Sequence, residues 1–208
     1  MRSLSLAGIA AVCGFCVAVI PATAAASDLV AIRIVIRTYD NAALLQDDHD
    51  EALAVATAIL ETAGLDVSWQ ACGPLSMQYA GHPCAMPLTA QELAIRFVQV
   101  PPPRYVDTVA LGYSLVDTEK RSGSLATVFV DRVTRIAAAG RLNVGTVLGR
   151  AAAHEIGHLL LGTTEHSHWG LMRALWTREI LQRNLAEDWV LSIRDRELLQ
   201  AAVRNRTR

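Results

Sequence analysis

The feature of this sequence that most constrains its fold is the stretch His154-Glu-Ile-Gly-His158. Its two histidines are four residues apart, so both imidazoles leave the same face of an α-helix. A helix presents two ligands to a zinc ion in this way. Glu155 is turned about 100° around the helix axis from His154, so its carboxylate can reach water at the metal without being a ligand. The pattern predicts a zinc site on a helix, with Glu155 as the catalytic residue.

The flanks of the motif also predict a helix. Three alanines precede it and three leucines follow it, and Gly162 is a natural C-terminal stop. Asn143 or Thr146 is suited to be the N-cap. The segment is apolar almost all round, which is typical of a helix in a protein core. Gly149 and Gly157 each cost about 1 kcal/mol of helix stability relative to Ala, and we expect them to permit close packing against a neighbouring element.

The first 26 residues differ in kind from the rest of the chain. Arg2 is followed by an apolar run over residues 4–20 and then by small residues. This pattern is typical of a secretory signal peptide, which we expect to be cut near Ala24 or Ala26. Of all residues 52% are hydrophobic and 19% charged, as in a compact protein. Residues 27–208 are therefore expected to form one domain, secreted or periplasmic, with no stable membrane anchor after cleavage.

Two cysteines remain after that cleavage, Cys72 and Cys84. In an exported chain they are expected to form a disulfide. A metal role together with His82 is the alternative, but the spacing fits no common zinc finger. The net charge of −1 is close to zero, and the basic ending at 204–208 is short and without aromatic residues. We therefore expect no nucleic-acid partner.

Hydrophobic periodicity predicts an α/β fold. Alternating or β-prone runs predict strands over residues 29–38, 65–71, 92–100, 109–115 and 124–133. A helical stripe covers residues 52–63, and two helical segments, 175–191 and 192–203, end the chain. The order of these elements predicts a mixed, mostly parallel sheet of about five strands, with a central zinc-binding helix and a C-terminal helix.

The motif and the residues after it carry a resemblance. The order His154-Glu-x-x-His158, then Gly162, then His166, then Met172 in a turn resembles the metzincin clan of zinc peptidases. It also resembles an uncharacterised group of secreted bacterial proteins with the form HExGHLLLG…HS…GxM. The resemblance implies a metzincin-like domain with one zinc per chain and His166 as the third ligand. It makes Gly162 the turn after the helix and Met172 the floor beneath the metal.

The spacing departs from the metzincin signature, which places Gly three and His six residues after the second ligand. Here Gly162 is four and His166 eight residues after it, so the local path must be wider. His168, two residues further on, is a rival third ligand. In another alternative a glutamate on a later helix binds the metal, as in gluzincins, and Glu179 and Glu187 lie at suitable distances along the chain.

The resemblance also implies where a substrate lies. In metzincins a peptide runs along the edge strand of the sheet, which here would be residues 109–115. Ala110 and Gly112 belong to an almost bare face of this strand. That face would let another backbone approach closely, as in β-addition of a peptide.

These observations predict a secreted zinc-dependent endopeptidase acting on a peptide or protein substrate. Zinc lowers the pKa of its water towards about 7, and Glu155 accepts the proton and delivers it to the leaving amine. One alternative is a non-catalytic zinc protein, whose site would be closed if His166 and His168 both bind. The other is a zinc hydrolase of cell-wall peptides or other non-protein amides.

Overall fold

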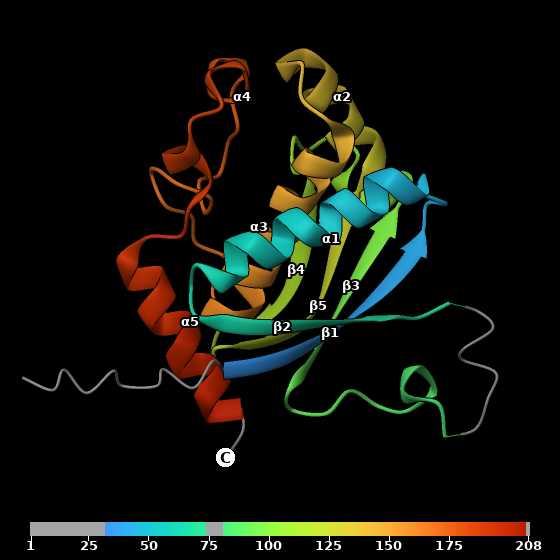
Figure 1. Cartoon of the computed structure of the whole chain (residues 1–208), viewed down its shortest axis with the longest axis vertical. Helices are drawn as coiled ribbons and strands as arrows, with labels where there is room; N and C mark the ends of the chain where they lie inside the picture. Colours follow the sequence, from blue (N-terminus) through green and yellow to red (C-terminus); the bar gives the residue numbers. More distant parts are fainter. Residues whose placement is uncertain (1–31, 74–80, 207–208) are drawn as a thin grey trace, which may run out of the picture.

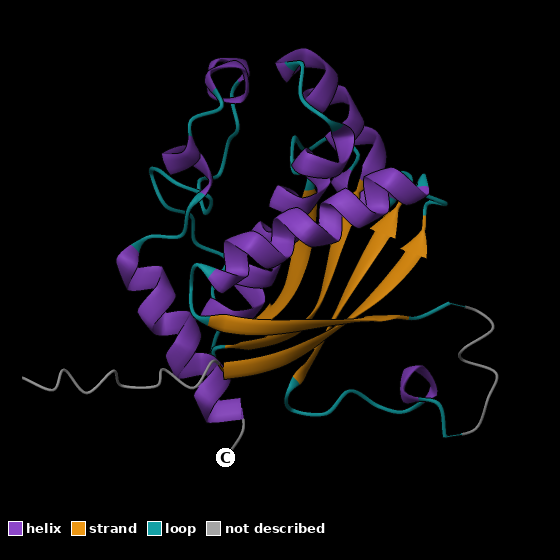
Figure 2. Ribbon diagram, in the orientation of Figure 1, coloured by secondary structure: helices purple, strands orange, loops and turns teal. Residues whose placement is uncertain are grey.

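A computed structural model describes residues 32–73 and 81–206; the predicted signal peptide lies outside the described residues. One five-stranded sheet has the order β2-β1-β3-β5-β4 (Figure 2). The first four of these strands are parallel to their neighbours, and β4 runs antiparallel to β5. The strands are β1 (Ile32–Asn41), β2 (Leu65–Ala71), β3 (Glu92–Val98), β4 (Gly112–Asp117) and β5 (Ser122–Phe129). The predicted mixed, mostly parallel sheet is confirmed.

Helices α1 and α3 lie side by side across the sheet, and α5 packs at the end of α3 (Figure 1). The helices are α1 (Gln46–Glu61), α2 (Val130–Gly140), α3 (Val144–Leu161), α4 (Arg178–Arg183) and α5 (Ile193–Arg206). Short 3₁₀ turns occur at η2 (Pro83–Ala85), η3 (Pro103–Tyr105) and η4 (Ala186–Trp189). Among the described residues, no helix is both long and apolar enough to cross a membrane.

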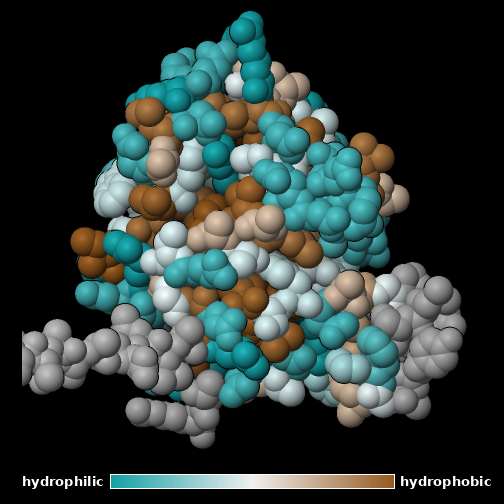
Figure 3. Space-filling model, viewed as in Figure 1, coloured by the Kyte–Doolittle hydropathy of each residue, from teal (hydrophilic) through white to brown (hydrophobic). Residues whose placement is uncertain are grey.

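The core lies between the helices and the sheet. In β1 the alternating Ile34 and Ile36 are fully buried, as the period of two requires. In α1 the buried positions Ala52, Ala56 and Leu60 recur every four residues and form one stripe. Several large hydrophobic side chains remain exposed elsewhere, and Figure 3 shows hydrophobic residues reaching the surface across the middle of the viewed face.

Helix α3 is buried along almost its whole length, as its apolar sequence predicted. Asn143 is its N-cap, and the side chain accepts a hydrogen bond from the main-chain N–H of Thr146 at 3.2 Å. A Cβ at Gly149 would lie 2.5 Å from the carbonyl oxygen of Ala52 in α1. The two helices approach so closely because this glycine has no side chain, and the predicted close packing at Gly149 is confirmed.

The run at 124–133, predicted as one strand, is divided between two elements. Strand β5 ends at Phe129 and α2 begins at Val130. Val130, Val133 and Ala137 are all buried, and their spacing of three and four residues is helical. The β-branched valines suggested a strand, but burial of this stripe determines the structure, as tertiary packing often overrides propensity.

Two further boundaries differ from the prediction. The strand expected over 109–115 begins at Gly112 and extends to Asp117. The segment 175–191, expected to be helical throughout, contains only the six-residue α4 and the turn η4. Both segments lie beside the three-histidine cluster, and contacts with residues distant in the sequence hold them as irregular chain.

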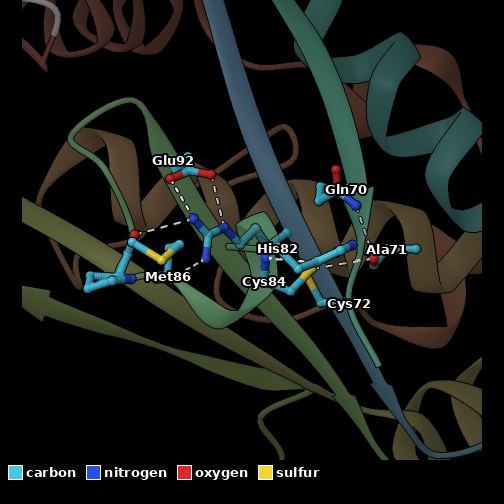
Figure 4. The surroundings of a disulfide bond; sticks show 9 residues. Gln70, Ala71, Cys72, His82, Cys84, Met86 and Glu92 are labelled. Carbon is cyan, nitrogen blue, oxygen red and sulfur yellow. Dashed lines mark hydrogen bonds and ion pairs between the residues drawn. A yellow bond between two sulfur atoms is a disulfide. The ribbon is translucent and has the colours of Figure 1, made fainter. Parts of the chain in front are cut away.

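The predicted disulfide is present. Cys72, after β2, and Cys84, in η2, are both buried and joined, with their Cα atoms 5.6 Å apart (Figure 4). His82 caps η2, since its ring Nδ1 accepts from the main-chain N–H of Cys84 at 3.2 Å. Arg37 donates to both carboxylate oxygens of Glu92, at 2.9 and 2.7 Å. The loop between β2 and β3 is therefore fixed at both ends, and His82 has a structural role.

Candidate metal centre

Three histidine side chains converge beside α3. His154 and His158 are one turn apart on this helix, and His166 comes from the loop that follows it. The Nε2 atom of His158 lies 3.0 Å from that of His154 and 3.3 Å from that of His166. Each ring can offer one ligand atom, and these atoms all lie within 4.8 Å of one another. The three nitrogen atoms therefore lie close enough together to hold one metal ion.

Main-chain carbonyls fix the tautomers of the two helix histidines. The Nδ1 atom of His154 lies 2.8 Å from the carbonyl oxygen of Leu171, and that of His158 lies 2.9 Å from that of Thr163. A carbonyl oxygen can only accept, so each Nδ1 carries the hydrogen and each Nε2 has a free lone pair. Two lone pairs that face each other at 3.0 Å cannot form a hydrogen bond. A cation between them resolves the conflict, and nitrogen donors suit zinc.

Burial keeps these rings in the neutral form that binds metal. Burial, and then the adjacent ring of His158, lower the pKa of His154 to about 3. Burial likewise lowers the pKa of His158 to about 4, and it lowers that of His166. At neutral pH all three rings are therefore uncharged, with lone pairs available to a metal.

The chain reverses at Gly162 to bring His166 back to the helix. Gly162 has φ of +63°, and a Cβ there would lie 2.2 Å from the main-chain carbon of Arg121 in the β4–β5 turn. A side chain has no room, so the predicted glycine turn is confirmed. Beyond His166, Ser167 donates its main-chain N–H to the carbonyl oxygen of Met172 at 2.8 Å. The loop that carries His166 is therefore joined to the turn at 170–172.

Met172 is buried beneath α3. Its sulfur lies 2.7 Å from where a Cβ of Gly157 would be, so Gly157 provides the space for it. The preceding residue, Leu171, supplies the carbonyl that binds His154. Leu171 is itself anchored, because its N–H donates to the carbonyl oxygen of Val190 at 2.9 Å. The turn thus lies against the helix and orients a histidine.

The side chain of Glu155 points towards β4. Its carboxylate is buried, and Ser114 Oγ donates to Oε2 at 2.6 Å. Burial raises the pKa of Glu155 to about 7, against the opposing effect of the hydrogen bond from Ser114. A carboxyl group with a pKa near neutrality can both accept and return a proton.

The structure separates the rival ligands from the cluster. His168 is exposed, and the three-histidine group found in residues 32–73 and 81–206 does not contain it. Glu179 in α4 and Glu187 in η4 are also exposed and outside that group. The structure therefore brings His166 to the helix pair, and none of the three alternatives.

A cleft of about 630 Å³ contains the three histidines and Glu155, a volume typical of small-molecule and peptide sites. Its first wall is formed by residues 105–114 and its second wall by residues 173–177. Two large apolar side chains stand exposed at these walls, Val109 (76%) and Leu175 (59%). Trp176 in the second wall lies edge-on to His154, with ring centroids 5.9 Å apart.

Arg132, at the start of α2, holds the first wall. Its guanidinium donates to the carbonyl oxygens of Tyr105, Val106 and Ala110 and to the hydroxyl of Thr108. Because these carbonyls bind a side chain, the segment before Gly112 is a loop and not a strand. The strand expected from residue 109 was therefore wrong before Gly112. A sequence does not show which main-chain carbonyls will bind a side chain.

Asp188 holds the second wall. It is buried in η4 and accepts from Arg173 at 3.2 Å and from Arg183 at 2.6 Å. The next residue, Trp189, packs edge-on against Trp176 at 5.1 Å between centroids. On Arg150 of α3, the guanidinium carbon lies 4.0 Å from the Trp189 ring centroid. The second wall is thus attached to α3. Asp188 carries no motif in the sequence, and Arg173, one of its two partners, is 15 residues away.

Solved structures share this fold. The chain is similar to the crystal structure of a zinc-dependent peptidase from Methanocorpusculum labreanum, with 17% identity and a TM-score of 0.51 over 79% of this chain and 99% of that one. It is also similar to metalloproteinase-II from Bacteroides fragilis, with 13% identity and a TM-score of 0.50 over 83% of this chain and 53% of that one. No protein-family model matches the sequence, and no curated protein matches it.

The protein therefore has the fold of a zinc metallopeptidase. At these identities the likeness defines the fold alone.

Proposed function

We propose that this protein is a secreted zinc-dependent metallopeptidase that hydrolyses peptide bonds with Glu155 as general base. The observation that carries the proposal is the convergence of three histidine Nε2 atoms. Two of these atoms carry no hydrogen, because the Nδ1 atoms of the same rings donate to main-chain carbonyls. Such orientation of ligands by outer hydrogen bonds is typical of a prepared metal site. The metallopeptidase fold supports the same function.

His154, His158 and His166 would hold one zinc ion per chain. Three protein ligands with one position left for water is the usual composition of a catalytic site, and four protein ligands that of a structural one. The exposed His168 lies outside the three-histidine group of the described residues. This favours an open catalytic site over a closed structural one.

When bound, zinc would act as a Lewis acid on the scissile carbonyl and lower the pKa of water. Glu155 takes a proton from the attacking water and then delivers it to the leaving amine. Its buried carboxyl group, with a pKa of about 7, is matched to both steps near neutral pH. A buried carboxylate beside the histidines has no use in a purely structural site.

We place the substrate peptide in the cleft between its two walls, extended along β4. The order of the sheet makes β4 an edge strand, so it has main-chain groups without a strand partner on one side. Ala110 and Gly112, which the sequence suggested for substrate contact, both line the cleft. The exposed Val109 and Leu175 would contact apolar side chains of the peptide.

Export is proposed from the N-terminal sequence and from the disulfide. The bond between Cys72 and Cys84 suits an oxidising compartment. Mass spectrometry of protein recovered from the secreted fraction would test this, with a mature N-terminus near Ser27 expected. A chain that keeps its first 26 residues inside the cell would contradict it.

The test of function combines metal content with peptide turnover. We expect one zinc per chain in the parent protein and in E155Q and H168A, and a loss of zinc in H166A. Zinc-loaded parent protein should cleave casein or a peptide library, and E155Q should lower the rate about 10²- to 10⁴-fold. Zinc lost in H168A but kept in H166A would refute the ligand set. No turnover of any peptide by the zinc-loaded parent would refute the peptidase.

A further inference from the structure

Strand β4 touches the proposed general base through one hydroxyl group. Ser114 Oγ lies 2.6 Å from Oε2 of Glu155 and 2.8 Å from the main-chain oxygen of the same residue. Within residues 32–73 and 81–206, no other side chain forms a hydrogen bond with this carboxylate. The buried end of Glu155 is thus held from the sheet and not from its own helix.

Gly112, on the same face of β4, accommodates the second carboxylate oxygen. A Cβ at this position would lie 2.8 Å from Oε1 of Glu155 and 2.4 Å from the carbonyl oxygen of Thr127. Gly112 and Ser114 are two residues apart, so both face α3. Ser114 therefore binds Oε2, and Gly112 leaves the space that Oε1 occupies.

We infer that Ser114 is a positioning residue, which holds the carboxylate of Glu155 in the orientation needed to take a proton from water. A glutamate side chain has three rotatable bonds and adopts many rotamers when nothing contacts its end. The hydroxyl of Ser114 selects one rotamer, in the cleft that also contains the three histidines. The inference rests on the proposed function of Glu155 as general base.

The hydroxyl suits both stages of the proton transfer. A serine has one hydrogen to donate and also accepts. While Glu155 is a carboxylate, Ser114 donates to Oε2. When Glu155 has taken a proton from water on Oε1, Ser114 still donates to Oε2, so the hydrogen bond is kept in both protonation states. The proton stays on Glu155 until the leaving amine takes it, so Ser114 neither gains nor loses one.

The variants S114A and S114T test the inference, with S124A as the matched control, since Ser124 is exposed on the neighbouring strand β5. We expect S114A to keep its zinc and its KM and to lose roughly 10- to 100-fold in kcat, the size seen when an outer partner of a metal-site group is removed. S114T restores the hydroxyl and should restore most of kcat. S124A should behave as the parent.

A double variant separates positioning from a general structural effect. If Ser114 acts through Glu155, the change S114A should cause no further loss in the E155Q background, because the group that it positions is no longer a base. An equal loss in both backgrounds would overturn the inference. So would full kcat in S114A, or a loss in S114T as large as that in S114A.

Crystal structures of the parent and of S114A give a readout that needs no turnover. We expect one rotamer of Glu155 in the parent and a moved or divided carboxylate in S114A. An unmoved carboxylate in S114A would refute positioning by Ser114. A parent protein without any peptidase activity would instead count against the proposed function, and the two failures are therefore distinguishable.

Discussion

Both walls of the cleft contain irregular chain, and a different kind of contact holds this chain in each wall. In the first wall Arg132 donates to three main-chain carbonyls and one hydroxyl. In the second wall a buried carboxylate, Asp188, accepts from Arg173 and Arg183. An arginine keeps its charge at every pH at which proteins fold, whereas a carboxylate does not. The comparison teaches that one wall depends on ionisation of an acid and the other does not.

The largest effect is expected when the carboxylate of the second wall is removed. Asp188→Ala leaves Arg173, whose side chain is only 11% exposed, without its acidic partner. Breaking a buried ion pair in this way costs about 3–5 kcal/mol, and chemical denaturation would measure the loss. Arg183→Ala is the control, because that side chain is half exposed and its removal should cost clearly less stability. Equal effects of the two variants would show that Asp188 does not hold the wall through Arg173.

A smaller effect is expected in the first wall. Arg132→Met keeps most of the side chain's apolar stem but removes the guanidinium that donates to the carbonyls of Tyr105, Val106 and Ala110. We expect a loss of about 1–3 kcal/mol, together with a higher KM for peptide because this wall contacts substrate in our proposal. The control is Arg135→Met on the same helix, where an exposed pair with Asp131 contributes less than about 0.5 kcal/mol. An unchanged KM in Arg132→Met would argue against a substrate contact there.

The smallest effect is a change in acid sensitivity. The hydrogen bond from Arg183 and then the charges of Arg183 and Arg173 hold the pKa of Asp188 below its usual range, despite its burial. The unfolded chain therefore binds this proton at a higher pH than the folded chain does. The stability that Asp188 contributes is complete above the ordinary aspartate pKa of about 3.9. It is lost as the pH falls towards the lower pKa of the folded state.

Urea unfolding of metal-free protein between pH 3 and 7 would measure this difference. The loss on acidification should be shallower in Asp188→Ala than in the parent, and as steep in Arg132→Met as in the parent. The histidines titrate in all three proteins, so their contribution cancels in the comparison. Identical slopes in the parent and Asp188→Ala would contradict the assignment of this acid-sensitive contact to the second wall.

The parts of the molecule that depend on local spacing were predictable from the sequence. The helix periodicity around His154 and His158, the stop at Gly162 and the cap at Asn143 all follow from contacts within a few residues, and the structure has them. The disulfide followed from the cysteine count and the predicted export of the chain. The alternation in β1 predicted the strand and its buried Ile34 and Ile36, but Arg37, expected on the other face, is buried as well.

The parts that depend on distant partners were not predictable. Val130 and Val133 favour a strand by propensity, and only the packing of α2 against α3 makes them helical. Arg132 and Asp188 are ordinary charged residues in the sequence, and their roles arise from groups that the fold brings near. The bare face of β4 was noticed, but its partner proved to be the side chain of Glu155. Sequence spacing had no means to pair positions 114 and 155.

The three histidines lie between positions 154 and 166, whereas two of the groups that orient the site come from outside this range. Ser114 is 41 residues from Glu155, and Leu171 is 17 residues from His154. In our proposal, a partly folded chain could therefore bind zinc through its local ligands before strand β4 packs against α3. Loop closure over a dozen residues is fast, and long-range pairing is slow. In the order of folding, capture of the ion would come first and competence for hydrolysis would come last, when β4 reaches the helix.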